Sequence, residues 1–189
     1  LGAIYVALGK DVEAIEASRR ALELDPRDAH VYYNLGVLES HGGDHSRAVF
    51  YYQKALELSP SLACGHAGMA SSYFHLGDLP DAIYHYSQAH QYDPDNPEVT
   101  RSFGVALMRV GQLSRAAYYL REAVELSPEW AEPRLELGEA CRRMGQDQEA
   151  LAELTAGLRL KRRPEGLVSL GLLHLKQGDP RRALGFIHE

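Results

Sequence analysis

The chain has 189 residues, of which 45% are hydrophobic and 24% are charged, and its formal net charge is −6. These proportions are typical of a soluble globular chain, and the acidic balance argues against non-specific binding to nucleic acid. The longest apolar stretch, residues 166–175, is much shorter than a membrane-spanning helix, so we expect no membrane insertion.

A six-residue phrase recurs along the chain at intervals of 34 residues, and each copy ends in a proline. The four copies are Ala21-Leu-Glu-Leu-Asp-Pro26, Ala55-Leu-Glu-Leu-Ser-Pro60, Ala89-His-Gln-Tyr-Asp-Pro94 and Ala123-Val-Glu-Leu-Ser-Pro128. A fixed period of this length indicates one supersecondary unit copied along the chain. In chain order it predicts a single array, with a partial repeat at 1–28, repeats at 29–62, 63–96, 97–130 and 131–163, and a partial repeat at 164–189.

Each repeat is expected to contain two helices joined by a glycine turn. The first helix carries an apolar residue followed by a small one, as in Leu35-Gly36 and Phe103-Gly104, and a glycine follows seven residues later. These turn glycines are Gly9, Gly43, Gly77, Gly111, Gly145 and Gly178. Glycine permits the positive φ that ends a helix. Five residues after it, the second helix has an alanine. These alanines are Ala14, Ala48, Ala82, Ala116, Ala150 and Ala183. We expect the small residues to let the two backbones approach closely, and the proline to end the second helix.

With second-helix aromatic residues at Tyr52 and Tyr86, this pattern resembles the tetratricopeptide repeat family over essentially the whole chain. The resemblance implies an all-α fold, a right-handed α-solenoid of about five and a half helix-turn-helix repeats. It also implies that the first helices line a concave groove and that the second helices face outward. The bulky aromatic residue that the family carries early in the first helix is Tyr32 in one repeat, but His66 stands there in the next.

The register breaks once, near the C-terminal end of the sequence. Arg162 stands where the period expects a proline, inside the basic run Lys161-Arg162-Arg163. We interpret this run as a solvated loop, and a phosphate or nucleic-acid contact is the alternative. The sequence also begins inside a first helix and stops inside a second one without polar capping helices. We therefore expect a fragment of a longer chain, or ends covered by another surface, through which the chain could self-associate.

Residues three, four and seven positions apart share one face of a helix, which identifies candidate groove residues on the first helices. These are Tyr33, Val37, Ser71, Phe74, Arg101, Val105 and Met108. Among them, Tyr33, Phe74 and Met108 are candidate pockets or anchors for apolar side chains of a bound peptide. Packing of the same side chains on neighbouring helices is the alternative interpretation.

Basic or titratable side chains recur just before the turn glycines. They are His41, His75, Arg109, Arg143 and Lys176, with Arg142 next to Arg143. If this line faces the groove, it predicts binding of an acidic peptide segment or a C-terminal carboxylate. The alternative is that these side chains only stabilise the negative C-terminal ends of their own helices.

The outward-facing side of the predicted array carries a line of aromatic residues. Phe50, Tyr84 and Tyr118 recur every 34 residues on the second helices. Three aromatic side chains in line on an outer face predict a second interaction strip. Their partial burial against the second helix of the next repeat is the alternative.

No phosphate-binding loop, nucleophile elbow or His-Glu-x-x-His zinc motif occurs in the sequence, and the nine histidines are scattered. We therefore expect no enzymatic activity, no cofactor and no metal. Cys64 and Cys141 stand two repeats apart, which is too far for a disulfide, so we expect free thiols. Free thiols favour a reducing compartment such as the cytoplasm, and nothing else in the sequence bears on localisation.

These observations predict a protein–protein interaction scaffold or adaptor that binds a peptide segment of a partner in its concave groove. Two alternatives stay open. The chain could be the non-catalytic recognition arm of a larger enzyme or secretion component, or it could be a self-assembling scaffold.

Overall fold

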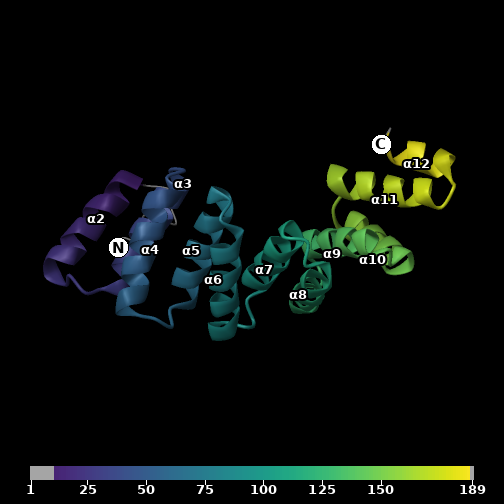
Figure 1. Cartoon of the computed structure of the whole chain (residues 1–189). Helices are drawn as coiled ribbons and strands as arrows, with labels where there is room; N and C mark the ends of the chain where they lie inside the picture. The colour runs from purple at the N-terminus through teal and green to yellow at the C-terminus, as the bar shows by residue number, and fades with distance from the viewer. Residues whose placement is uncertain (1–10, 188–189) are drawn as a thin grey trace. The chain divides into compact units, whose positions relative to one another are not determined.

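The computed structural model describes residues 11–187, and all regular structure in that part of the chain is α-helical (Figure 1). The sequence prediction of an all-α protein built from helix-turn-helix repeats is confirmed. The chain divides into two compact units, Leu1–Pro94 and Asp95–Glu189, called unit 1 and unit 2 below. The predicted turn glycine Gly9 lies outside the described residues.

The helices of unit 1 pack as helical hairpins. They are α2 (Asp11–Leu24), α3 (Ala29–His41), α4 (His45–Leu58), α5 (Ala63–Leu76) and α6 (Leu79–Tyr92). Helix α3 pairs with α4 and α5 pairs with α6, while α4 packs on α5 and α3 touches α5. We call the earlier helix of each hairpin its first helix and the later one its second helix.

Unit 2 repeats the same arrangement. Its helices are α7 (Pro97–Arg109), α8 (Leu113–Leu126), α9 (Ala131–Met144), α10 (Asp147–Leu160), α11 (Pro164–Lys176) and α12 (Pro180–Ile187). The hairpins are α7–α8, α9–α10 and α11–α12, and the first helix α9 touches both α7 and α11. The first helices of unit 2 therefore lie side by side and form a common face.

Each described hairpin turn contains a glycine in the left-handed backbone conformation, as the sequence predicts. The φ angles are 83° at Gly43, 84° at Gly77, 78° at Gly111, 80° at Gly145 and 80° at Gly178. Side chains rarely tolerate a positive φ, so glycine is needed where the chain leaves the first helix.

The second helices end two residues before the repeated prolines. Thus α2 ends at Leu24, α4 at Leu58, α6 at Tyr92 and α8 at Leu126. Helix α10 ends at Leu160 although Arg162 replaces the proline. There Pro164 begins α11, and Lys161 and Arg163 are both extended. A proline disfavours helical backbone in the residue before it, which helps to end α10 at this junction.

Small residues lie where the two helices of a hairpin meet. The second-helix alanines Ala14, Ala48, Ala82, Ala116 and Ala150 have no exposed surface. On the first helix of the third hairpin, a Cβ added to Gly104 would lie 2.7 Å from Cγ of Leu120 and 3.3 Å from the carbonyl oxygen of Ala116. The close approach of backbones that the sequence predicts is therefore present at this hairpin.

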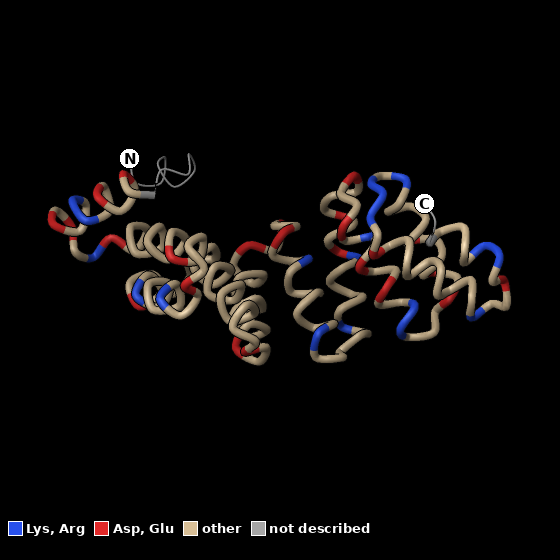
Figure 2. The backbone as a smooth tube through the Cα atoms, turned by 90° about the horizontal axis from the view of Figure 1, so that it is seen from above, with Lys and Arg blue, Asp and Glu red and all other residues tan. Residues whose placement is uncertain are grey.

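The two units differ in charge. Unit 1 carries 6 Lys and Arg against 12 Asp and Glu, whereas unit 2 carries 14 of each. Figure 2 shows the basic positions concentrated in unit 2. The negative net charge of the chain therefore belongs to unit 1. No helix between residues 11 and 187 has both the length and the apolar character that crossing a bilayer requires.

Candidate functional site

Tyr33 and Val37 of α3 contribute to a buried cluster as well as to the surface. Both side chains are partly buried and pack against Tyr52 and Met69. The ring centroids of Tyr33 and Tyr52 are 5.9 Å apart. Part of each predicted groove side chain is thus committed to the core of unit 1, and only its remaining surface can contact a partner.

The other predicted groove residues of unit 1 lie toward the ends of α3 and α5. Ser71 and Phe74 are partly buried, whereas His41 and His75 are exposed. Nδ1 of His75 lies 2.8 Å from the carbonyl oxygen of Ser71, and its ring stacks on His45 with centroids 4.5 Å apart. Such a hydrogen bond, from a histidine to a carbonyl in the last turn of its own helix, is expected if His75 stabilises the negative end of α5.

Arg101 of α7 is held by Glu136 of α9 in a two-point ion pair. Nε donates to Oε2 of Glu136 at 2.8 Å, and a terminal nitrogen donates to Oε1. The guanidinium group also lies over the ring of Trp130, 5.3 Å from its centroid. Burial raises the pKa of Glu136, while the hydrogen bonds from Arg101 act in the opposite direction. Arg101 therefore joins two first helices, and its charge is largely satisfied within unit 2.

A second ion pair lies one turn further along α9. Both bonds between Arg142 and Glu139 are 2.8 Å long, and the hydroxyl of Ser169 on α11 donates to Glu139 at 2.8 Å. Burial raises the pKa of Glu139, but the hydrogen bonds from Arg142 and Ser169 lower it overall. Glu139 thus remains ionised near neutral pH and links α9 to α11.

Val105 and Met108 of α7 are partly buried and pack against the main apolar cluster of unit 2. Arg109 and Arg143 are exposed. A terminal nitrogen of Arg143 donates to the carbonyl oxygen of Met108 at 3.3 Å, in the last turn of α7. Arg143 therefore stabilises a helix end and still presents its charge to solvent. Lys176 differs, because it pairs with Asp147 at 2.7 Å.

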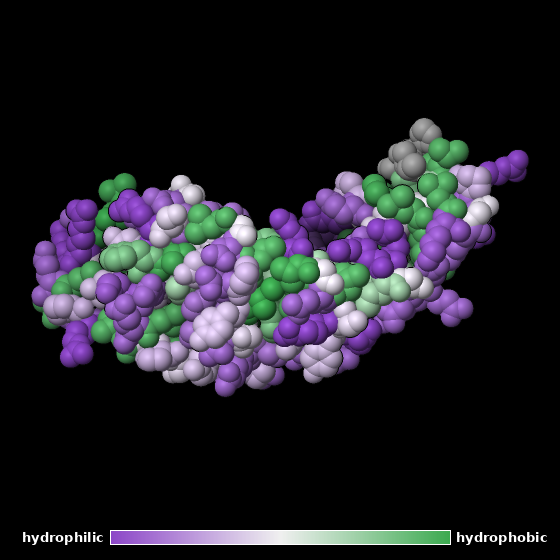
Figure 3. Space-filling model, viewed as in Figure 1, coloured by the Kyte–Doolittle hydropathy of each residue, from purple (hydrophilic) through white to green (hydrophobic). Residues whose placement is uncertain are grey.

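Helix α11 carries an exposed apolar stripe that the groove and outer-strip patterns in the sequence do not include. Val168, Leu172 and Leu175 are 56%, 45% and 49% exposed. They occupy the same positions of the repeat as Tyr33, Val37 and Ser40. The repeat register could therefore have identified them. Figure 3 shows apolar side chains gathered over α11. We call these three residues the α11 stripe.

The predicted outer strip is exposed in each unit. Phe50 of α4 and Tyr84 of α6 are 56% and 57% exposed in unit 1, and Tyr118 of α8 is 61% exposed in unit 2. Phe50 and Tyr118 each make an edge contact with the tyrosine that follows them in sequence. More than half of each side chain therefore stays available to a partner.

The two thiols are free, and their surroundings do not activate them. Cys64 is exposed and Cys141 is buried. Burial raises the pKa of Cys64, and it raises the pKa of Cys141 to about 11. Thiolate is the nucleophilic form, so both groups are poor nucleophiles at neutral pH. Within residues 11–187, no group of three or more His, Cys, Asp or Glu side chains is arranged to hold a metal ion.

Stacked helical hairpins with glycine turns and satisfied ion pairs between first helices define a helical repeat protein of the interaction-scaffold class. Sequence-family models confirm this class. A TPR repeat model matches residues 2–42 and 70–111, and two tetratricopeptide repeat models match residues 29–62 and 107–167. The chain belongs to the tetratricopeptide repeat family.

Solved structures of other repeat proteins are similar to this chain. YrrB, described as a TPR protein with an unusual peptide-binding site, is 26% identical with a TM-score of 0.81, over 91% of this chain and 89% of YrrB. PilF of Pseudomonas aeruginosa is 20% identical with a TM-score of 0.84, over 98% of this chain and 85% of PilF. MamA is 22% identical with a TM-score of 0.75, over 80% of this chain and 89% of MamA. No curated protein matches the chain.

Proposed function

We propose that this protein is an interaction scaffold that binds a peptide segment of a partner along the face of its first helices. The family and its structural neighbours support the scaffold role, and the family is typically non-catalytic. The observation that carries the peptide-binding proposal is the α11 stripe, which exposes Val168, Leu172 and Leu175 beside the ion pair of Glu139 and Arg142. YrrB, at 26% identity, has a peptide-binding site and supports the same proposal.

The α11 stripe has the physical character of a peptide-binding surface. A peptide side chain that covers half of an exposed leucine removes apolar surface from water, which contributes about 1 kcal/mol for each such residue. The polar groups beside the stripe are already hydrogen-bonded to each other. A bound peptide can therefore cover these groups, and each of them keeps a hydrogen-bond partner when water is displaced. The stripe supplies affinity, and the ion pairs hold the helices that present it.

Replacing Leu172 and Leu175 together with aspartate should weaken peptide binding at least about tenfold, because buried carboxylates would oppose apolar contact. The probe is a set of peptides selected from a random display library against the intact chain, with affinities measured by fluorescence polarisation. Tyr118→Asp is the matched control, since Tyr118 is similarly exposed but lies on the second helix α8. Full affinity in the double variant, with loss in Tyr118→Asp, would place binding on the outer face instead.

The basic residues just before the turn glycines predict a preference for acidic peptides. Among them, Arg143 is the most informative residue to replace. Arg142 and Lys176 are already paired with carboxylates, whereas the contact of Arg143 is a backbone carbonyl. In the double variant Arg109→Ala/Arg143→Ala we expect weaker binding of acidic peptides and a smaller loss of affinity on adding salt. Titrations at several salt concentrations measure both. An unchanged affinity with an unchanged salt dependence would contradict the acidic-peptide proposal.

A further inference from the structure

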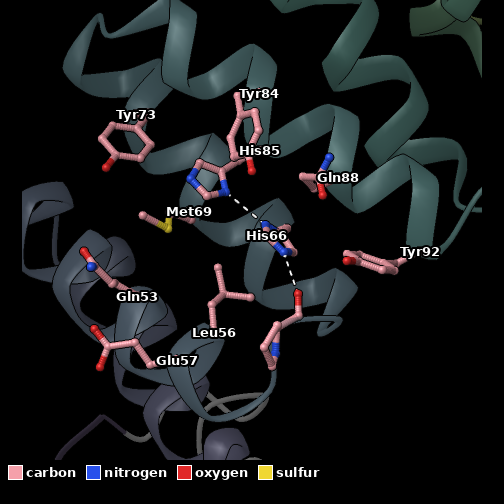
Figure 4. A pocket seen from close by; sticks show the side chains of 11 residues that line it. Gln53, Leu56, Glu57, His66, Met69, Tyr73, Tyr84, His85, Gln88 and Tyr92 are labelled. Atoms are coloured by element: carbon pink, nitrogen blue, oxygen red, sulfur yellow. Dashed lines mark hydrogen bonds between the residues drawn. The ribbon is translucent and has the colours of Figure 1, made fainter.

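Unit 1 contains a cavity lined by the second helices α4 and α6 and by the first helix α5. It has a volume of about 560 Å³ and lies between α4, α5 and α6 (Figure 4). Its lining consists of Gln53, Leu56, Glu57, Pro60, His66, Met69, Tyr73, Tyr84, His85, Gln88 and Tyr92. This volume is within the range of protein pockets that hold small ligands or side chains of a partner.

A chain of hydrogen bonds sets the tautomers of two histidines in this cavity. Nε2 of His66 lies 3.0 Å from the carbonyl oxygen of Pro60, and Nδ1 of His66 lies 2.9 Å from Nδ1 of His85. A carbonyl oxygen only accepts, so Nε2 of His66 carries a hydrogen. In the neutral ring its Nδ1 then accepts, and Nδ1 of His85 donates. The lone pair of a neutral His85 is therefore left on Nε2.

The free nitrogen of His85 faces the cavity. In Figure 4 it points away from His66, toward the side where Tyr73 lies. No described residue forms a hydrogen bond with it. The ring of Tyr73 stacks on His85 with centroids 5.8 Å apart, and Tyr84 meets His85 edge-on at 5.0 Å. His85 thus presents an unused acceptor inside an aromatic wall.

The remaining lining groups favour a cationic donor. The carboxylate of Glu57, the amides of Gln53 and Gln88 and the tyrosine rings supply acceptors and π faces, and the lining contains no Lys or Arg. Glu57 pairs with Lys54, but that pair is exposed and contributes little, so it can be exchanged for another cation. Unit 1 as a whole carries a net charge of −6, from 6 basic and 12 acidic residues, which attracts a basic partner.

We propose that this cavity binds an arginine side chain from a segment of a partner protein. The planar guanidinium would stack on a tyrosine ring and donate to Nε2 of His85, and the carboxylate of Glu57 would attract its positive charge. A lysine ammonium lacks the planar fork and stacks less well. A free arginine would also bring an α-carboxylate, which the negative net charge of unit 1 would repel. The charge of the unit therefore favours arginine within a polypeptide over the free amino acid.

The probe for this proposal is N-acetyl-arginine amide, which has the side chain and neutral ends of an arginine in a chain. In ¹⁵N-detected histidine ring spectra of the intact chain, we expect saturable shifts of the His85 Nε2 signal, with a dissociation constant of about 1–10 mM. N-acetyl-citrulline amide is nearly isosteric but neutral, and it should bind at least about tenfold more weakly. The lysine analogue and free arginine should also bind more weakly.

Variants localise the binding. Glu57→Gln and Tyr84→Ala change exposed side chains and should weaken binding of the probe several-fold without unfolding the chain. His85→Phe should abolish it, because the ring remains but the acceptor is lost. His75→Phe, in the same unit but outside the cavity, is the matched control and should bind normally. Equal binding of the arginine and citrulline probes, stronger binding of N-acetyl-phenylalanine amide, or full binding by both Glu57→Gln and Tyr84→Ala would overturn the proposal.

Discussion

Replacing Gly138 with alanine should lower the free energy of unfolding of unit 2 by about 1–3 kcal/mol, the usual cost of overpacking a core. This is the opposite of the usual effect, because alanine is favoured over glycine by about 1 kcal/mol inside a helix. The reason is local. A Cβ at position 138 would lie 2.6 Å from Cγ of Leu154 and 3.0 Å from its backbone nitrogen. The leucine side chain can turn only into a packed core, and the backbone of α10 would have to move.

Urea unfolding followed by the fluorescence of Trp130, the single tryptophan, measures this effect in unit 2. The matched control is Gly171→Ala, at the same position of the next hairpin. There the nearest atom to an added Cβ is the carbonyl oxygen of Ala183 at 3.5 Å, an ordinary contact. We expect Gly171→Ala to be neutral or stabilising by up to about 1 kcal/mol. Equal effects of the two substitutions would contradict the close-packing argument.

Unit 1 should lose stability as the pH falls from about 6.5 to about 4, through His85. Burial, together with the neighbouring His66, lowers the pKa of His85 from 6.5 to about 4. Between these values the unfolded chain binds a proton at this position and the folded chain does not. The free energy of unfolding is therefore highest above pH 6.5 and decreases as the pH falls through this window.

Urea unfolding measured by circular dichroism from pH 4 to pH 8 gives the pH dependence of the free energy of unfolding. Comparison of variants shows whether His85 causes it. His85→Gln keeps a donor for Nδ1 of His66 but does not titrate, so its stability should change less over the same range. The titratable groups that line the cavity with His85 are His66 and Tyr73 on α5, Glu57 on α4, and Tyr84 and Tyr92 on α6. If His85→Gln and wild type have the same slope, His85 does not carry the effect.

Much of the fold could be predicted from the sequence because its determinants are local. Gly77 and Gly145 were predicted to end helices, and both adopt the positive φ that a side chain resists. The second-helix alanines were predicted to permit close approach, and those such as Ala48 and Ala116 are completely buried. These residues act within one hairpin of about 34 residues, so a repeated pattern reveals them.

The candidate site could be predicted only in part. The register identified the first-helix positions, including Arg101 and Arg142, but it could not show which charges are already satisfied. Arg101 is bound by Glu136, 35 residues away, and Arg142 is bound by Glu139 on its own helix. The Arg142–Glu139 pair is local, three residues apart on one helix, whereas the pairing of Arg101 depends on which side chains meet across helices.

The sequence by itself determined the repeat, its turns, the family and the positions available on each helix face, because backbone preferences and apolar spacing act over short distances. Only the tertiary structure decided that Val168, Leu172 and Leu175 stay exposed, and that His66 meets His85 from a neighbouring helix. His66 stands where the family carries a bulky aromatic residue, and no spacing rule indicated a partner for it. Exposure and pairing depend on the packing of side chains from different helices, which the order of residues does not show.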